Sequence, residues 1–295
     1  MQVVLRLLCM LIALCPLAAA KAQSKIEVVA SFSILADITA QIGGERVHVS
    51  TLVPREADAH VFQPAPQDAR RIARAGAVII NGLGFEGWME RLIKAAGGNP
   101  RIIMASQTIV PLKSTDPHLR GLDPHAWHDV ATVKSYVATI RDGLSAMDPD
   151  GQSLYRQRAQ AYLLQLDQLD AEIRASLADI PPARRIIVTS HDAFGYYARA
   201  YGIRMLAPQG VSTETEASAK DIAKVIKQIR AQSIPAVILE NVSDPRLLEQ
   251  IARETGAKIG GKLYSDSLSL ETGSASTYID LMRHNTRTLK DAMMP

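Results

Sequence analysis

Histidines and carboxylates concentrate at a few places in this chain, close behind short runs typical of β-strands. The sequence contains only seven histidines. The candidate ligands that follow such runs are His60, His125, His128, His191 and Asp266. Neutral imidazole and carboxylate are the donors that a borderline divalent cation such as Zn²⁺ takes from a protein. Because these donors are scattered along the chain, they predict one buried metal site assembled between two lobes.

The elements expected to position these residues alternate between strand-like and helix-like segments. Short β-branched runs occupy residues 26–32, 47–53, 77–81, 101–105, 185–189, 204–207, 236–240 and 257–263. Each is followed by a loop and a helical pattern, which is typical of an α/β fold with parallel sheets whose strands are buried on both faces. Ligands of open parallel sheets gather at the carboxyl ends of the strands, where His191 and Asp266 stand.

The clearest helix is expected between residues 149 and 180. Its apolar residues recur three or four positions apart and form one stripe, made of Tyr162, Leu166, Leu169, Ile173 and Leu177. A helix of about 28 residues spans about 40 Å, which is longer than one lobe needs. The pattern therefore predicts a long helix that connects two Rossmann-like lobes.

The expected organisation follows from chain length and from the N-terminal pattern. A single positive charge, Arg6, precedes an apolar run over residues 7–20, as in a signal peptide. The chain of 295 residues is too long for one comfortable core. We expect a signal peptide at 1–22, an N-terminal lobe at 23–148, the long helix at 149–181 and a C-terminal lobe at 182–295.

Composition excludes several kinds of partner. Both cysteines, Cys9 and Cys15, lie in the expected signal peptide, so no thiolate ligand remains after export. Leu14, directly before Cys15, argues against a lipid anchor. The net charge is +3 without long basic runs, and aromatic residues make up 5%, which argues against nucleic acid as a partner.

Each candidate ligand also has a plainer interpretation. His60 is as well explained by a surface loop as by a metal site. Asp129 is a suitable helix N-cap, which places His128 outside the helix and favours an exposed position or a contact behind a ligand. Asp266 could cap a helix instead of binding metal. Glu240 closes a strand and is expected in the cleft behind a ligand rather than on the metal.

The remaining histidines and Ser190 are not expected to bind metal or to take part in catalysis. His48, His118 and His284 are expected to be ordinary surface residues. Ser190 lies beside His191 but lacks the Gly-x-Ser-x-Gly turn of a hydrolase, which argues against a catalytic triad.

The segments around the candidate ligands resemble the metal-specific solute-binding proteins of ABC importers, the ZnuA/TroA family (cluster A-I). The similarity covers nearly all of the mature chain. It is carried by Ala30-Ser-Phe-Ser-Ile-Leu-Ala-Asp37, Asp58-Ala-His60, Asn81-Gly-Leu-Gly-Phe-Glu86, Asp123-Pro-His125-Ala-Trp127, Ser190-His191-Asp192-Ala-Phe-Gly195-Tyr-Tyr197 and Tyr264-Ser-Asp266-Ser-Leu268. The resemblance implies two α/β lobes joined by a single long helix, with the metal site in the cleft between them.

The resemblance also implies a ligand set and a function. His60 and His125 would come from the N-terminal lobe, and His191 and Asp266 from the C-terminal lobe. Members tuned to manganese often carry a carboxylate where this chain has His191, so Zn²⁺ is favoured and Mn²⁺ is the alternative. The expected protein is a periplasmic monomer that delivers zinc to the transmembrane subunit of an ABC permease.

Two other classes remain as alternatives, a zinc metallohydrolase and a metal-dependent adhesin. A catalytic zinc keeps an open position for water, which four protein ligands do not leave. For the carrier, protons compete with metal for neutral histidine, so affinity is expected to fall below a pH of about 6.5. Because the long helix is stiff, we expect metal release through movement of the loops at residues 123–129 or 192–195.

Overall fold

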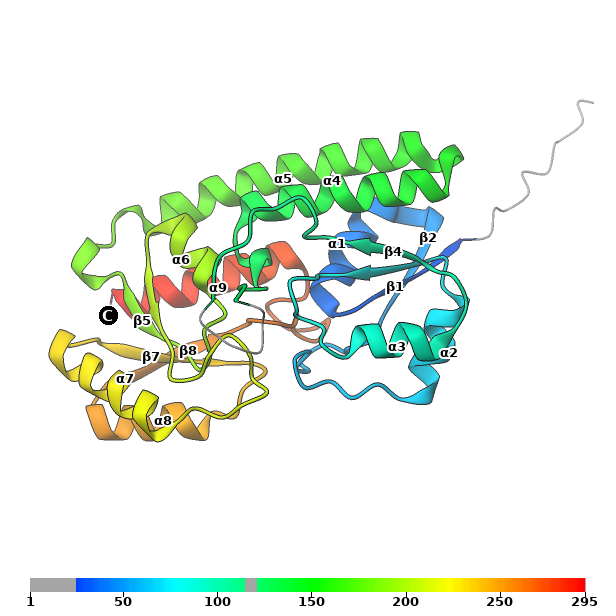
Figure 1. Ribbon diagram of the computed structural model, residues 1–295. Coiled ribbons are helices and arrows are strands. Elements are labelled where there is room, and N and C mark those ends of the chain that lie inside the picture. Colours follow the sequence, from blue (N-terminus) through cyan, green and yellow to red (C-terminus); the bar gives the residue numbers. More distant parts are fainter. Residues whose placement is uncertain (1–24, 115–120, 295) are drawn as a thin grey trace, which may run out of the picture.

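The computed structural model of the protein describes residues 25–114 and 121–294 (Figure 1). The expected signal peptide at 1–22 and His118 therefore lie outside the described residues. Among the helices of the described part of the chain, none is both long enough and apolar enough to cross a membrane.

The N-terminal half forms a four-stranded parallel sheet. Its strands are β1 (Ile26–Ala30), β2 (Val47–Thr51), β3 (Ala77–Ile80) and β4 (Arg101–Met104), in the order β2-β1-β3-β4. Three helices alternate with these strands, α1 (Ser33–Gly43), α2 (Pro66–Arg74) and α3 (Met89–Ala96). The parallel order brings the carboxyl ends of the strands to one edge of the sheet, where the loops meet the second lobe.

The C-terminal half repeats this arrangement. Its strands are β5 (Ile186–Val188), β6 (Arg204–Leu206), β7 (Ala236–Glu240) and β8 (Lys258–Leu263), in the order β6-β5-β7-β8. The helices of this half are α6 (Gly195–Tyr201), α7 (Ala219–Gln232), α8 (Arg246–Thr255) and α9 (Tyr278–Met293). The predicted α/β fold with two parallel sheets is confirmed, and every predicted strand overlaps one of these eight.

The prediction that the strands are buried on both faces holds only for the central strands. All residues of β5 are buried, and so are most residues of β3 and β7. In β4, by contrast, Ile102 and Met104 are exposed, and β8 is exposed over most of its length. Both are edge strands of their sheets.

Two long helices, α4 (Val130–Met147) and α5 (Gln152–Ala178), lie side by side along one face of the molecule, as Figure 1 shows. The helix predicted between 149 and 180 is α5, preceded by a 3₁₀ turn over Pro149–Gly151. It packs against α4, against α1 of the N-terminal lobe and against α9 of the C-terminal lobe. Its buried stripe contains the five predicted apolar residues and belongs to one core that includes residues of both lobes. The lobes are therefore joined by packing as well as by the chain.

We expect Leu169→Ala to lower the free energy of unfolding by about 2–5 kcal/mol, because it opens a cavity in this shared core. Leu169 has no exposed surface. Leu164→Ala is the matched control, since Leu164 lies on the same helix and is 56% exposed. It should change the free energy by no more than about 0.5 kcal/mol. Urea denaturation of the two variants measures the difference, and equal losses would contradict a core shared along α5.

Candidate metal centre

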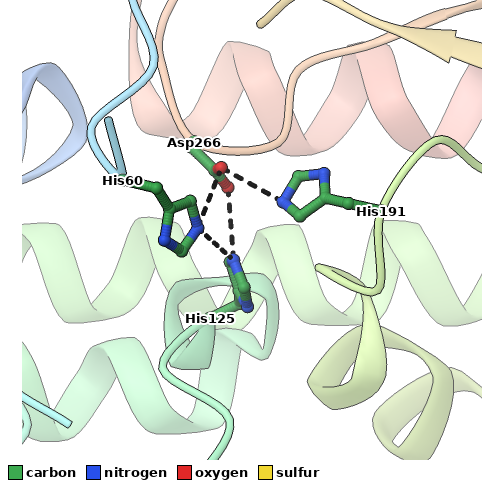
Figure 2. A group of neighbouring side chains, drawn as sticks. All are labelled: His60, His125, His191 and Asp266. Carbon is green, nitrogen blue, oxygen red and sulfur yellow. Dashed lines mark hydrogen bonds and ion pairs between the residues drawn. The ribbon is translucent and has the colours of Figure 1, made fainter. Parts of the chain in front are cut away.

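Four side chains that are distant in sequence converge on one point (Figure 2). His60, His125, His191 and Asp266 each offer one ligand atom, and these atoms all lie within 4.8 Å of one another. His60 is 3% exposed, and the other three have no exposed surface. The structure thus brings together the four side chains that the sequence singled out, and it places them between the two sheets.

The distances inside this cluster suit a single small cation. Nε2 of His60 lies 3.3 Å from Nε2 of His125. The carboxylate oxygens of Asp266 lie 3.6 Å from each of these nitrogens and 3.2 Å from Nε2 of His191. In a tetrahedral zinc site, donors at 2.0–2.1 Å from the metal stand about 3.3 Å apart. Most of these donor atoms are therefore already spaced as such a site requires.

Several polar atoms of the cluster lack a hydrogen-bond partner. Both carboxylate oxygens of Asp266 and Nε2 of His191 are buried without one, and they approach each other only as an ion pair at 3.2 Å. A buried polar group left in this way costs about 1–3 kcal/mol. A divalent cation at the centre would supply the missing partner, and three imidazoles with one carboxylate are a donor set that zinc accepts.

Carboxylates outside the cluster orient the two histidines of the N-terminal lobe. His60 lies between β2 and α2, and its backbone N–H donates to Oδ1 of Asp58 at 2.9 Å. His125 lies between β4 and α4, and Oδ1 of Asp123 accepts from its backbone N–H at 2.9 Å and from Nδ1 at 2.8 Å. With its proton on Nδ1, His125 presents the lone pair of Nε2 to the centre.

Glu240 does the same for His191 in the C-terminal lobe. It ends β7, and its Oε1 accepts from the backbone N–H groups of Ser190 and His191 at 2.7 and 3.0 Å. Its Oε2 lies 2.6 Å from Nδ1 of His191. Glu240 therefore stands behind His191, as the sequence led us to expect, and it turns Nε2 toward Asp266.

Asp266 follows β8 in a loop, and the interpretation of this residue as a helix N-cap is wrong. The next helix, α9, begins only at Tyr278. The loop is held from the other lobe, because Nε1 of Trp127 donates to the carbonyl of Ser265 at 2.9 Å. Since Trp127 is two residues from His125, one hydrogen bond couples the loops that carry two of the candidate ligands.

The position of His128 differs from both expectations, which were an exposed side chain and a contact behind a ligand. It ends a 3₁₀ turn, and Asp129 caps α4 by accepting from the N–H of Ala131, as predicted. The side chain of His128 is fully buried rather than exposed, and it packs on Phe194 with a centroid distance of 4.5 Å. Neither ring nitrogen has a hydrogen-bond partner. It is not part of the group of four converging donors.

The other described histidines lie away from the cluster. His48 is exposed and pairs with Glu27, its register partner on β1, at 2.7 Å. His284 is half-buried rather than fully exposed, because its ring lies against Tyr264 and its Nε2 is 2.9 Å from the carbonyl of Lys262.

Sequence reasoning placed Asp123 and Gly195 only in motifs and at the bounds of loops expected to move, and both also shape the site. The Asp-x-His spacing at Asp58-Ala-His60 recurs at Asp123-Pro-His125 and was the available signal for Asp123. Gly195 begins α6, and a Cβ at this position would stand 2.6 Å from Oδ2 of Asp123. The next residue, Tyr196, donates its hydroxyl to the carbonyl of Asp123 at 3.0 Å. Because residue 195 is glycine, the C-terminal lobe can come close to Asp123, the carboxylate that holds His125.

The protonation states of the cluster follow from burial and from neighbouring charges. Burial lowers the pKa of His60 to about 3, so its ring is neutral. Burial alone would raise the pKa of Asp266, but the charges of His191 and His125 outweigh it and hold the pKa below its usual value. Burial would lower the pKa of His191, but Glu240 and Asp266 together raise it well above 6.5. His191 is therefore the group whose proton competes with a metal ion.

Comparison with known proteins finds a consistent relationship over nearly the whole chain. A family model described as zinc-uptake complex component A, periplasmic, matches residues 28–292. The chain is 36% identical over 265 residues to the manganese-binding lipoprotein MntA of Halalkalibacterium halodurans, covering 89% of this chain and 87% of that protein. It is 33% identical over 266 residues to the iron-binding protein YfeA of Yersinia pestis, covering 90% and 85%.

A third relative links sequence and structure. The zinc-binding protein TroA of Treponema pallidum is 32% identical over 279 residues, covering 93% of this chain and 91% of that protein. The solved structure of TroA matches with a TM-score of 0.87 at 31% identity, covering 92% of this chain and all of that one. The relatives are named for three different metals. Similarity therefore establishes the type of protein but does not identify the metal that it binds.

The raised pKa of His191 changes the expected pH dependence of metal binding. A raised pKa means that the proton is held up to a higher pH, so a proton must leave His191 over a range that extends above the reference value of about 6.5. We expect affinity for zinc to fall by up to about tenfold per pH unit as pH is lowered through this range. The fall thus begins at a higher pH than the sequence alone indicated.

Chelator competition between about pH 8 and about pH 6 measures this dependence. The matched variant is Glu240→Gln, which keeps an acceptor for the backbone of His191 but removes one charge that raises the pKa. In this variant, the fall in zinc affinity should shift to lower pH. A zinc affinity that is constant over this range in the unmodified chain would contradict the assignment.

Proposed function

The chain belongs to the family of zinc-uptake complex component A periplasmic proteins, which are metal-binding components of ABC importers and not enzymes, and on that premise we propose that it captures Zn²⁺ outside the cytoplasm. His60, His125, His191 and Asp266 hold the ion, and Glu240 supports the site from behind His191. The ion is then delivered to the transmembrane subunit of an ABC permease.

One observation carries this proposal: the donor atoms of three imidazoles and one carboxylate converge within 4.8 Å in a buried place. Four protein donors complete a tetrahedral zinc shell and leave no open position for a water nucleophile. Such a closed site suits carriage of an ion rather than hydrolysis. The choice of zinc rests on the third imidazole, His191, because nitrogen ligands favour zinc over the harder manganese ion.

A manganese carrier is the second candidate. The relative MntA is named as manganese-binding and is 36% identical to this chain. Asp266 can offer two oxygens, and oxygen donors suit manganese. The three imidazoles weigh against this alternative, since N/O sites bind Zn²⁺ more tightly than Mn²⁺.

The remaining features of the proposal concern place and organisation. The expected signal peptide directs the chain to the periplasm, where it acts as a monomer without a lipid anchor. Leu14 before Cys15 supports the absence of an anchor, although the relative MntA is named a lipoprotein. The lobes extend over 23–148 and 182–295, with the connecting helix at 149–181.

Metal competition tests the proposal. The exported chain is loaded with Zn²⁺ and Mn²⁺, with manganese in roughly hundredfold excess to offset the intrinsic preference of N/O sites. Native mass spectrometry with elemental analysis should find one zinc per chain. His191→Ala should lose or weaken this retention because it removes one of four ligands, whereas His284→Ala, outside the cluster, should retain it.

Manganese retained under these conditions would replace zinc as the cargo. Retention of one zinc by His191→Ala with unchanged affinity would remove the proposed site.

A further inference from the structure

We propose that the hydrogen bond from Thr213 to Asp58 is a latch between the lobes that sets the rate of metal release. It holds a segment that we call the strap, residues 209–217, against the N-terminal lobe beside the candidate metal centre. The strap belongs to the connection between β6 and α7. This inference rests on the proposed function, because it takes the four converging side chains as the metal ligands.

The first end of the strap is attached to the ligand His191. Gln209 forms an isolated parallel bridge with His191, and its N–H donates to the carbonyl of Ser190 at 3.4 Å. The N–H of Asp192 donates to the carbonyl of Gly210 at 3.1 Å. The backbone on both sides of His191 is therefore paired with the beginning of the strap.

The strap then contacts Asp58, the carboxylate that holds the ligand His60 in the other lobe. The hydroxyl of Thr213 donates to Oδ2 of Asp58 at 2.6 Å. Oδ1 of the same carboxylate accepts the backbone N–H of His60 at 2.9 Å. A single carboxylate thus joins the strap to His60, and the strap connects a ligand of one lobe to a ligand of the other.

Residues of the strap also line two hollows beside the centre. One, of about 460 Å³, is lined by Asp58, Ser190 and Thr213 among others. The other, of about 520 Å³, is lined by His60 together with Ser212 and Glu214 of the strap. Among the four ligands, His60 alone has exposed surface. His60 is therefore the ligand nearest to solvent, and Ser212 and Glu214 of the strap line the hollow beside it.

The loops at residues 123–129 and 192–195, expected from the sequence to open, are held more firmly. Asn81 donates to the carbonyl of Pro124 at 2.9 Å, and Trp127 donates to the carbonyl of Ser265. Tyr196 donates to the carbonyl of Asp123, next to the close approach of Gly195. Thr213, by contrast, is only partly buried, so water can compete for its bond to Asp58. This segment is the easier one to open.

The test compares three variants of the exported chain loaded with Zn²⁺. Thr213→Val keeps the shape of the side chain and removes the hydroxyl, Thr213→Ser keeps the hydroxyl, and Thr215→Val makes the same change at an exposed position of the strap. Zinc release into an excess of a chromogenic chelator is followed by stopped flow. The zinc content of each variant before mixing and the thermal unfolding of its metal-free form are measured alongside.

We expect Thr213→Val to release zinc about tenfold faster, as loss of one charge-assisted hydrogen bond implies. Thr213→Ser and Thr215→Val should release it at the rate of the unmodified chain, and all should hold one zinc before mixing. An unchanged rate in Thr213→Val, or equal acceleration in Thr213→Ser, would overturn the latch while leaving the metal site intact. Absence of bound zinc from the unmodified chain would instead overturn the proposed function, and the latch with it.

Discussion

An ionised carboxylate with no exposed surface and no hydrogen bond lies at the centre of this protein. Asp266 is surrounded by three imidazoles, and the charge of His191 above all keeps its pKa low in spite of burial. Such a group is costly unless positive charge stands against it. A protonated His191 can supply that charge in the absence of metal, and a divalent cation supplies more of it. Exchange of this proton for the cargo is the simplest account of how the site remains folded when it is empty and binds when metal arrives.

The need to hold this cluster explains why the lobes are so closely joined. The loop after β8 carries Asp266 and then lies on the N-terminal lobe: the N–H of Leu268 donates to Oγ of Ser33 at 2.9 Å, and the carbonyl of Leu268 accepts from Glu56 at 3.1 Å. The same core continues along α5 through both halves. We therefore expect that the lobes do not swing far apart and that short segments with few contacts give access to a buried ion.

The sequence was sufficient for the fold and for the four side chains that converge, because both leave periodic or local signals. Alternating strand and helix patterns predicted all eight strands, and the stripe of Leu166 and Leu169 predicted the connecting helix. His60, His125, His191 and Asp266 stand in compact motifs that drew attention to them. The residues that hold and orient these four side chains could be predicted only in part. Whether Asp58 meets Thr213, or Gly195 meets Asp123, depends on how loops of different lobes pack, and contacts over such separations leave no periodic pattern. Burial of His128 was missed for the same reason, since it depends on Phe194 from the other half.

The central claim is that one ion is held by three imidazoles and one carboxylate drawn from both lobes. X-ray absorption spectroscopy at the zinc edge of the loaded, exported chain tests it most directly. The account predicts four N/O donors at about 2.0–2.1 Å, with the outer-shell scattering of three imidazole rings. A six-coordinate shell, or scattering from fewer than three imidazoles, would contradict it.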